Sequence, residues 1–191
     1  IWNGIHQCYM FQESLKQVSN EYVTDEMKKQ YLAESNFLIA YYHLLSMRSY
    51  GPTMIIRSVI DLETPISGFP ERSSIDEVVA FINEKLDEAM SEGGLPTTWS
   101  GKDYGRATRL AALALKSRVY LYAASPLYNG NTEMYADFRS PLDGRQLIAQ
   151  EKSQAKWEIS ATQTKYAIDE VEKAKFHLYH DADAGEPSDA K

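Results

Sequence analysis

Apolar side chains recur every three or four residues along most of the chain, and this spacing gathers them on one face of an α-helix. The pattern predicts five helices, over the ranges 5–18, 25–49, 74–92, 107–124 and 152–173. Elsewhere, apolar and polar residues alternate over only a few positions, and the stretch 53–57 best suits a short extended segment. The sequence therefore predicts an all-α fold.

Two of these helices carry distinct apolar stripes, which are the expected contact surfaces. The helix 25–49 has two apolar faces, so we expect neighbouring helices to pack on both of them. One face holds Tyr31, Leu38, Tyr41, Tyr42 and Leu45, and the other holds Ala33, Phe37, Ala40, Leu44 and Met47. The stripe of the last helix holds Ala155, Ile159, Thr162, Gln163, Tyr166, Ala167, Glu170 and Val171.

Local signals mark the helix ends and the connections between them. Ser74 and Glu77 have the spacing of a capping box, in which each side chain satisfies a free backbone N–H at a helix start. Gly51, followed by proline, ends the preceding helix. The connections 49–73 and 125–151 are about twice the length at which structureless loops become uncommon. Long loops on a helical scaffold often carry function.

The predicted helices form two antiparallel pairs, 25–49 with 74–92 and 107–124 with 152–173. Such pairs are typical of tetratricopeptide-like repeats, which stack into an α–α superhelix, although the strict period of about 34 residues is absent. A helix within residues 1–24 leads into the repeats. Residues 181–191 contain no large apolar side chain, so we expect a loop or a frayed tail there.

The charge and cysteine content exclude several classes of protein. The chain has 20 Lys and Arg residues against 27 Asp and Glu residues and a net charge of −7, which disfavours nucleic acid as the main partner. The single cysteine, Cys8, excludes an internal disulfide and a cysteine-based zinc site. No apolar run approaches the roughly 20 residues of a membrane-spanning helix. Because the chain begins with Ile1 and lacks a signal-peptide pattern, we expect its first residue not to be the start of the gene.

The sequence shows no motif for enzymatic chemistry. It contains no glycine-rich phosphate loop, nucleophile elbow or HExxH string, and we predict neither catalytic residues nor a cofactor. His177, His180, Asp181 and Asp183 are close in sequence but lie where the last helix runs out into a loop, so we predict no metal site there. A glycosidase pair of carboxylates stays open as an alternative, because composition alone does not indicate which of the 27 acidic residues would face each other across a cleft.

Aromatic side chains next to amides are the best candidates for ligand contacts. An aromatic ring stacks on the apolar face of a sugar, while amide and carboxylate groups bind the sugar hydroxyls. The candidate ligand-binding residues are Trp2, Asn3, Trp99, Tyr128 and Asn129. The alternative for each aromatic residue is an ordinary position in the core or in a loop. Trp157 follows the helical pattern and is expected in the core, and Arg106 is expected to hold neighbouring helices together.

Two segments resemble conserved strings of the SusD/RagB family. Residues 33–51, AESNFLIAYYHLLSMRSYG, are similar to the family segment EAxFLRAYYYFxLVxxYGxVPL. Residues 104–130, YGRATRLAALALKSRVYLYAASPLYNG, are similar to the block GRaTkxAAxALkARvxLYaASPLyN. Weaker similarities over 74–96 and 157–179 occur in the same order. Ile39 stands where the family usually has Arg, and Pro52 is shifted forward relative to the family loop, which puts the local contacts of that loop in doubt.

The resemblance implies a SusD-like domain over residues 25–180, in a non-enzymatic, nutrient-binding lipoprotein of the Bacteroidetes outer membrane. Such proteins lie on the extracellular face, over a SusC-like TonB-dependent transporter, and deliver glycans to it. They are held there by a lipid anchor. Members of the family are much longer, so the resemblance also implies that this chain is an internal piece.

Three alternatives stay open at this stage. A RagB-type member would bind peptides in place of glycans. A helical-repeat module would only dock other proteins and would have no ligand site of its own. A hydrolase would need two carboxylates, or a nucleophile and a base, in one pocket.

Overall fold

The structure is a computed structural model that describes residues 1–61 and 63–178. The helices are α1 (Trp2–Gln17), α2 (Asp25–Tyr50), α3 (Ile75–Ala89), α4 (Arg109–Ala124), the short α5 (Thr132–Tyr135) and α6 (Gln154–Lys173). The strands are β1 (Thr53–Met54) and β2 (Arg72–Ser73), and single 3₁₀ turns occur at Ile66–Gly68 and Gly101–Asp103. The predicted all-α class is confirmed. The predicted tail, 181–191, lies outside the described residues.

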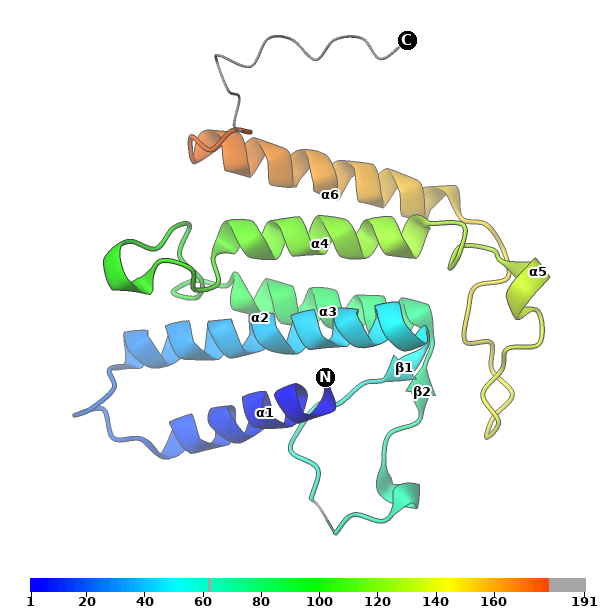
Figure 1. The fold of residues 1–191 in the computed structure, drawn as a ribbon, viewed down its shortest axis with the longest axis horizontal. Coiled ribbons are helices and arrows are strands. Elements are labelled where there is room, and N and C mark those ends of the chain that lie inside the picture. The colour runs from blue at the N-terminus through cyan, green and yellow to red at the C-terminus, as the bar shows by residue number, and fades with distance from the viewer. Residues whose placement is uncertain (62, 179–191) are drawn as a thin grey trace.

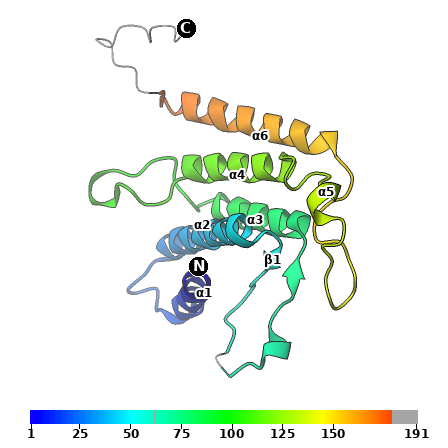
Figure 2. The same cartoon turned by 45° about the vertical axis from the view of Figure 1, so that its right-hand side comes forward.

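The five long helices form a stack in chain order. α1 packs on α2, α2 on α3, α3 on α4, and α4 on α6. Figures 1 and 2 show this layered arrangement from the blue α1 to the orange α6, with the connections projecting from the ends of the helices. The most extensive contacts join α2 to α3 and α4 to α6. Within the described residues, no helix is long and apolar enough to cross a membrane.

Two apolar cores lie on either side of α2. The larger core joins α2, α3 and α4 and includes Ala40, Leu44 and Met47 of α2. The smaller core joins α1, α2, α3 and the segment after β1, and its buried residues are Ile5, Cys8, Tyr9, Ile39, Ile56 and Phe81. α2 therefore contacts neighbours on two sides, as its pattern predicts.

The prediction for one of the two apolar faces of α2 is partly wrong. Leu38 and Tyr41 keep 40% and 39% of their surface exposed, whereas Ser35 and His43 are buried with Ile39. α1 packs on the face that carries these polar residues. Gln12 of α1 donates to Ser35 Oγ at 3.1 Å, and Ser35 Oγ in turn donates to the carbonyl of Cys8 at 3.2 Å. Hydrogen bonds between α1 and α2 thus replace part of the apolar contact that the sequence pattern predicts for this face.

The predicted stripe of α6 is also displaced. Ala155, Ile159 and Thr162 are exposed, and the buried residues of this helix are Ser160 and Ala167. These small side chains let α6 approach α4 closely, and a hydrogen bond of 2.7 Å joins the hydroxyls of Ser117 and Thr164 across the contact. Trp157 is half-buried and belongs to neither core.

The connection between α2 and α3 begins and ends in a two-residue antiparallel sheet. Thr53 pairs with Ser73, and Met54 pairs with Arg72. The predicted capping box is confirmed at the start of α3: Ser74 N donates to the Glu77 carboxylate at 2.7 Å, and Glu77 N donates to Ser74 Oγ at 3.3 Å. The Glu77 carboxylate accepts hydrogen bonds from both Ser74 N and Ser74 Oγ, and these hold the pKa of Glu77 below its ordinary value. The sheet fixes both ends of the loop that Figure 2 shows projecting from the helical stack.

A buried histidine attaches this connection to the helices. His43 is fully buried, and its Nδ1 lies 2.8 Å from the carbonyl of Ile39. Its Nε2 accepts a hydrogen bond from Ile56 N at 3.2 Å, which requires a neutral ring with the proton on Nδ1. Its ring lies edge-on to Phe81. Burial lowers the pKa of His43 to about 4, because the charged form would lose its hydration.

We therefore expect the protein to lose stability between pH 7 and pH 5. The pKa of His43 is lower in the folded state than its value of about 6.5 in the unfolded chain, so the unfolded state takes up more protons between these values. The contribution of neutral His43 is complete above about pH 6.5 and falls by about 2 kcal/mol at pH 5. Urea unfolding of wild type and His43→Gln at both pH values measures this difference.

The His43→Gln variant should lack this part of the pH dependence. The exposed His177 provides a matched control, since His177→Gln should keep the wild-type dependence. Equal pH dependence in wild type and His43→Gln would show that His43 does not titrate in this way.

Candidate functional site

A hollow of about 400 Å³ lies between the start of α1 and the connection that follows β1. Its lining residues are Trp2, Asn3 and His6 from α1, and Met54, Ile56, Ser58, Ile60, Asp61 and Phe69 from the β1–β2 region. The structure thus brings two of the sequence-predicted residues, Trp2 and Asn3, into the wall of one hollow. Trp2 and His6 are four residues apart, so they lie on the same side of the helix.

The wall of the hollow combines aromatic and polar groups. Trp2 is half-buried and Phe69 has 41% of its surface exposed, so both rings contribute apolar surface near solvent. Asn3 and Asp61 are exposed, and Asp61 Oδ1 accepts a hydrogen bond of 2.8 Å from Glu63 N, which orients the carboxylate. Aromatic surface next to an amide and a carboxylate is the chemistry that binds sugars.

The connection that forms this wall is held from two helices. Tyr9 on α1 donates to the carbonyl of Ile56 at 2.8 Å, and the buried His43 on α2 accepts from the N–H of the same residue. Burial raises the pKa of Tyr9 well above its ordinary range, so its hydroxyl keeps the proton that it donates. Both polar groups of the Ile56 backbone are thus used to fix the chain beside α1.

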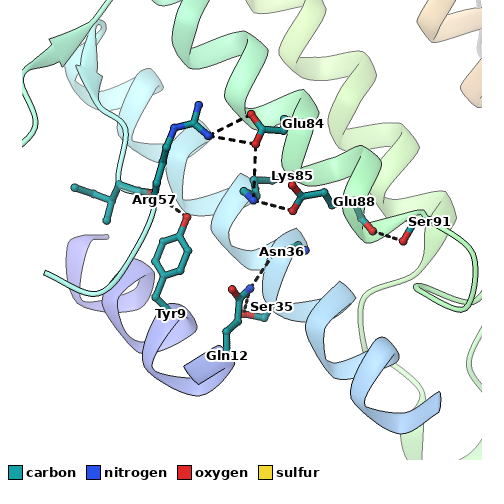
Figure 3. A network of polar contacts seen from close by, with 10 residues as sticks. Tyr9, Gln12, Ser35, Asn36, Arg57, Glu84, Lys85, Glu88 and Ser91 are labelled. Atoms are coloured by element: carbon teal, nitrogen blue, oxygen red, sulfur yellow. Dashed lines mark hydrogen bonds and ion pairs between the residues drawn. The ribbon is translucent and has the colours of Figure 1, made fainter. Parts of the chain in front are cut away.

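The next residue, Arg57, attaches the connection to α3. Its Nη1 lies 3.2 and 3.3 Å from the two carboxylate oxygens of Glu84, and its guanidinium stacks 4.7 Å from the ring of Phe81. Lys85 lies between Glu84 and Glu88 and extends this network along α3, as Figure 3 shows. The hollow is therefore bordered by backbone that three helices hold in place.

A second hollow, of about 420 Å³, is also lined by Trp2. Its lining residues are Trp2, Tyr50, Thr53, Met54, Pro70 and Arg72. Trp2 and Met54 border both hollows. We call these the Asp61 hollow and the Arg72 hollow.

Trp99 lies in a different part of the molecule and is used within the loop between α3 and α4. Its Nε1 donates to the carbonyl of Ala107 at 2.7 Å, and the Arg106 guanidinium lies 4.1 Å from its ring. Arg106 also pairs with Glu34 on α2 and, at 2.9 Å, with Asp103. The expectation that Arg106 holds neighbouring elements together is confirmed. Because this cluster occupies the indole N–H and one ring face, we leave Trp99 out of the proposed ligand site.

Tyr128 and Asn129 are each only 4% exposed and bind the protein backbone. The Tyr128 hydroxyl donates to the carbonyl of Met47 at 3.2 Å. Asn129 Nδ2 donates to the carbonyls of Ala124 and Ser153 at 3.2 and 2.9 Å, and its Oδ1 accepts from Ser153 N at 2.8 Å. These contacts join the end of α4 to the start of α6. We therefore assign a structural role to both residues and leave them out of the proposed ligand site.

Sequence reasoning missed the other residues of the two hollows. The only signal for them was the length of the connection 49–73, which marked it as a candidate functional loop. Its pairing with the first turn of α1 depends on tertiary contacts through Tyr9 and His43. No local pattern in the loop predicts that Asp61, Phe69 or Arg72 lies near Trp2.

The structural role of Asn129 predicts a large difference between two Asn→Ala substitutions. Asn129→Ala removes the partner of one buried backbone carbonyl, at Ala124, and of two part-buried backbone groups, at Ser153, which we expect to lower the free energy of unfolding by about 2 to 3 kcal/mol. Asn3→Ala, at an exposed position, should change it by less than about 0.5 kcal/mol. Chemical denaturation of both variants measures the difference. Similar effects of the two substitutions would contradict the assignment.

Comparison with known proteins identifies the family. A SusD-like family model, described as starch-binding and associating with the outer membrane, matches residues 1–121. The solved structure of BT4246 is 35% identical, with a TM-score of 0.83 over 93% of this chain and 30% of that one. No curated protein matches the sequence.

Two further structures are similar over shorter stretches. A SusD-like protein, BF3747, from Bacteroides fragilis is 30% identical, with a TM-score of 0.54 over 63% of this chain and 22% of that one. Surface glycan-binding protein A from Bacteroides fluxus is 28% identical, with a TM-score of 0.53 over 74% of this chain and 30% of that one. The chain thus spans less than a third of the length of each of these structures. On the family match and the shared fold, the chain belongs to the SusD-like family.

Proposed function

We propose that this chain is part of a glycan-binding protein and that the Asp61 hollow is a ligand site in it. The observation that carries the proposal is the meeting of Trp2 and Phe69 with Asn3 and Asp61 around one hollow. The family description supports it, since that description is of starch-binding proteins. So does the name of the Bacteroides fluxus relative, a surface glycan-binding protein.

Binding is expected to involve stacking and hydrogen bonds, without bond cleavage. Glycoside hydrolysis requires two carboxyl groups on either side of the scissile bond. Among the described residues that line the Asp61 hollow, Asp61 is the single carboxylate. Trp2 and Phe69 would stack on the apolar faces of a sugar, while Asn3 and Asp61 would bind its hydroxyls.

For the whole protein we propose delivery of the bound glycan to a SusC-like TonB-dependent transporter. The family description, which places these proteins at the outer membrane, supports this role. In this proposal the protein lies on the extracellular face and is held there by a lipid anchor. The helical stack provides the scaffold that positions the ligand-binding loop.

The proposal predicts that Trp2 is needed for glycan binding. Trp2→Ala should weaken the binding of a neutral oligosaccharide at least tenfold, because it removes the stacking surface, whereas Trp2→Phe should retain most of the affinity. Isothermal titration calorimetry with maltoheptaose and with laminarihexaose measures both variants. Tyr22→Ala, at a position 80% exposed on another part of the molecule, is the control and should bind like wild type.

Two results would contradict the proposal. One is equal affinity of wild type and Trp2→Ala for every oligosaccharide that binds. The other is a folded chain that binds peptides and no glycan, which would favour the RagB-type alternative.

A further inference from the structure

The two hollows beside Trp2 form neighbouring compartments of one surface. They share Trp2 and Met54, so a ligand against Trp2 in the Asp61 hollow lies next to the Arg72 hollow. Each has a volume in the range of about 300–1,000 Å³ that is usual for small-ligand sites. Their size and position suit consecutive units of a chain-like ligand.

The strand pairing brings Arg72 next to this shared wall. Arg72 on β2 is the register partner of Met54 on β1. The backbone at Arg72 is held further by Arg145, whose Nη2 donates to the Arg72 carbonyl at 2.9 Å. The backbone position of Arg72 relative to the shared wall is therefore set by the strand pairing and by the side chain of Arg145.

The charge of Arg72 is left uncompensated by its neighbours. Its Nη1 donates to the carbonyls of Pro52 and Tyr50 at 3.1 and 3.4 Å, and both of these acceptors are neutral. Within the described part of the chain, no carboxylate forms an ion pair with it, whereas Arg57 and Arg145 each pair with one and Arg106 pairs with two. The guanidinium is positively charged and retains further N–H donors.

Arg72 is the one charged residue among those that line the Arg72 hollow in the described part of the chain. The chain carries a net charge of −7, so an exposed, unpaired guanidinium at the rim of a hollow is a local positive site in an acidic molecule. A guanidinium binds a carboxylate or a sulfate through two parallel hydrogen bonds, and the opposite charges add an attraction that neutral hydroxyls lack. The Arg72 hollow therefore favours an anionic group.

We propose that the Arg72 hollow binds an acidic sugar unit, so that the ligand is an acidic oligosaccharide. One unit stacks on Trp2 in the Asp61 hollow, and the carboxylate or sulfate of the next unit binds Arg72. This inference rests on the proposed function, because it assumes a glycan beside Trp2. The anionic group has two possible sources, a uronic acid and a sulfate ester, which share the same chemistry toward Arg72.

The test compares three probes in calorimetric titrations. Trigalacturonic acid carries carboxylates, a κ-carrageenan tetrasaccharide carries sulfate esters, and galactotriose is neutral. Arg72→Gln should weaken the binding of at least one acidic probe tenfold or more and change the affinity for galactotriose less than twofold. Arg72→Lys, which keeps the charge but loses the planar pair of donors, should give an intermediate loss. Raising the salt concentration should weaken the binding of the acidic probe only.

Arg118→Gln is the matched control, because it removes the same charge from another exposed arginine, on α4. It should leave the affinities for all three probes unchanged. Equal losses in Arg72→Gln and Arg118→Gln would assign the effect to net charge and overturn the proposal. Binding of an acidic peptide through Arg72, with no binding of either acidic sugar, would also overturn it.

The variants separate this inference from the proposed function. If Trp2→Ala weakens the binding of every glycan while Arg72→Gln changes no affinity, the glycan site beside Trp2 is supported. The proposal that Arg72 binds an acidic sugar unit is then refuted. If Trp2→Ala changes nothing, the site beside Trp2 is refuted together with the inference that rests on it. Loss with only one of the two acidic probes supports the proposal and identifies the anionic group as a carboxylate or a sulfate.

Discussion

The candidate site depends on two hydrogen bonds to a single backbone unit, that of Ile56. Its N–H donates to the buried His43 of α2, and its carbonyl accepts from Tyr9 of α1. Both partners are side chains within the smaller core, where an unsatisfied backbone group is costly. The connection between α2 and α3 therefore leaves the helical stack at a fixed point, next to the first turn of α1. The contacts made by Arg57 and later residues fix the rest of the connection, whose starting position is already determined by the hydrogen bonds of Ile56.

The close approach of α1 to α2 depends on Gly4. A Cβ atom at this position would lie 2.6 Å from the ring of Tyr42, closer than real Cβ contacts come, so a larger residue would require the ring or the helix to move. Gly4 lies between the site residue Asn3 and the core residue Ile5 in the same helical turn. The packing that buries the smaller core thus also sets where Trp2 emerges beside the connection. The scaffold and the site are consequences of the same helix contact.

Sequence reasoning succeeded where the signal was local. The capping box at Ser74 and the five long helices depend on residues within a few positions of each other, and all of them occur in the structure. It failed on the second face of α2, because two polar residues are buried there and a hydrophobic pattern predicts both to be exposed. Ser35 is buried against α1, and His43 is buried against Phe81 and the backbone of Ile56. Tyr128 and Asn129 show a related ambiguity. The groups that bind sugar hydroxyls also bind backbone carbonyls, so residue type alone does not separate a ligand site from a loop anchor.

The position of Trp2 between two hollows bears on the length of ligand that the surface would select. A single sugar fills one hollow and gains one set of contacts, whereas a linked second unit enters the neighbouring hollow at a high effective concentration. The second unit also meets an indole ring that the first unit has already ordered, so part of the entropy loss is not repeated. A surface built in this way would discriminate by degree of polymerisation and would favour short chains over their monomers. Such a preference would suit the glycan binding that we propose for this protein.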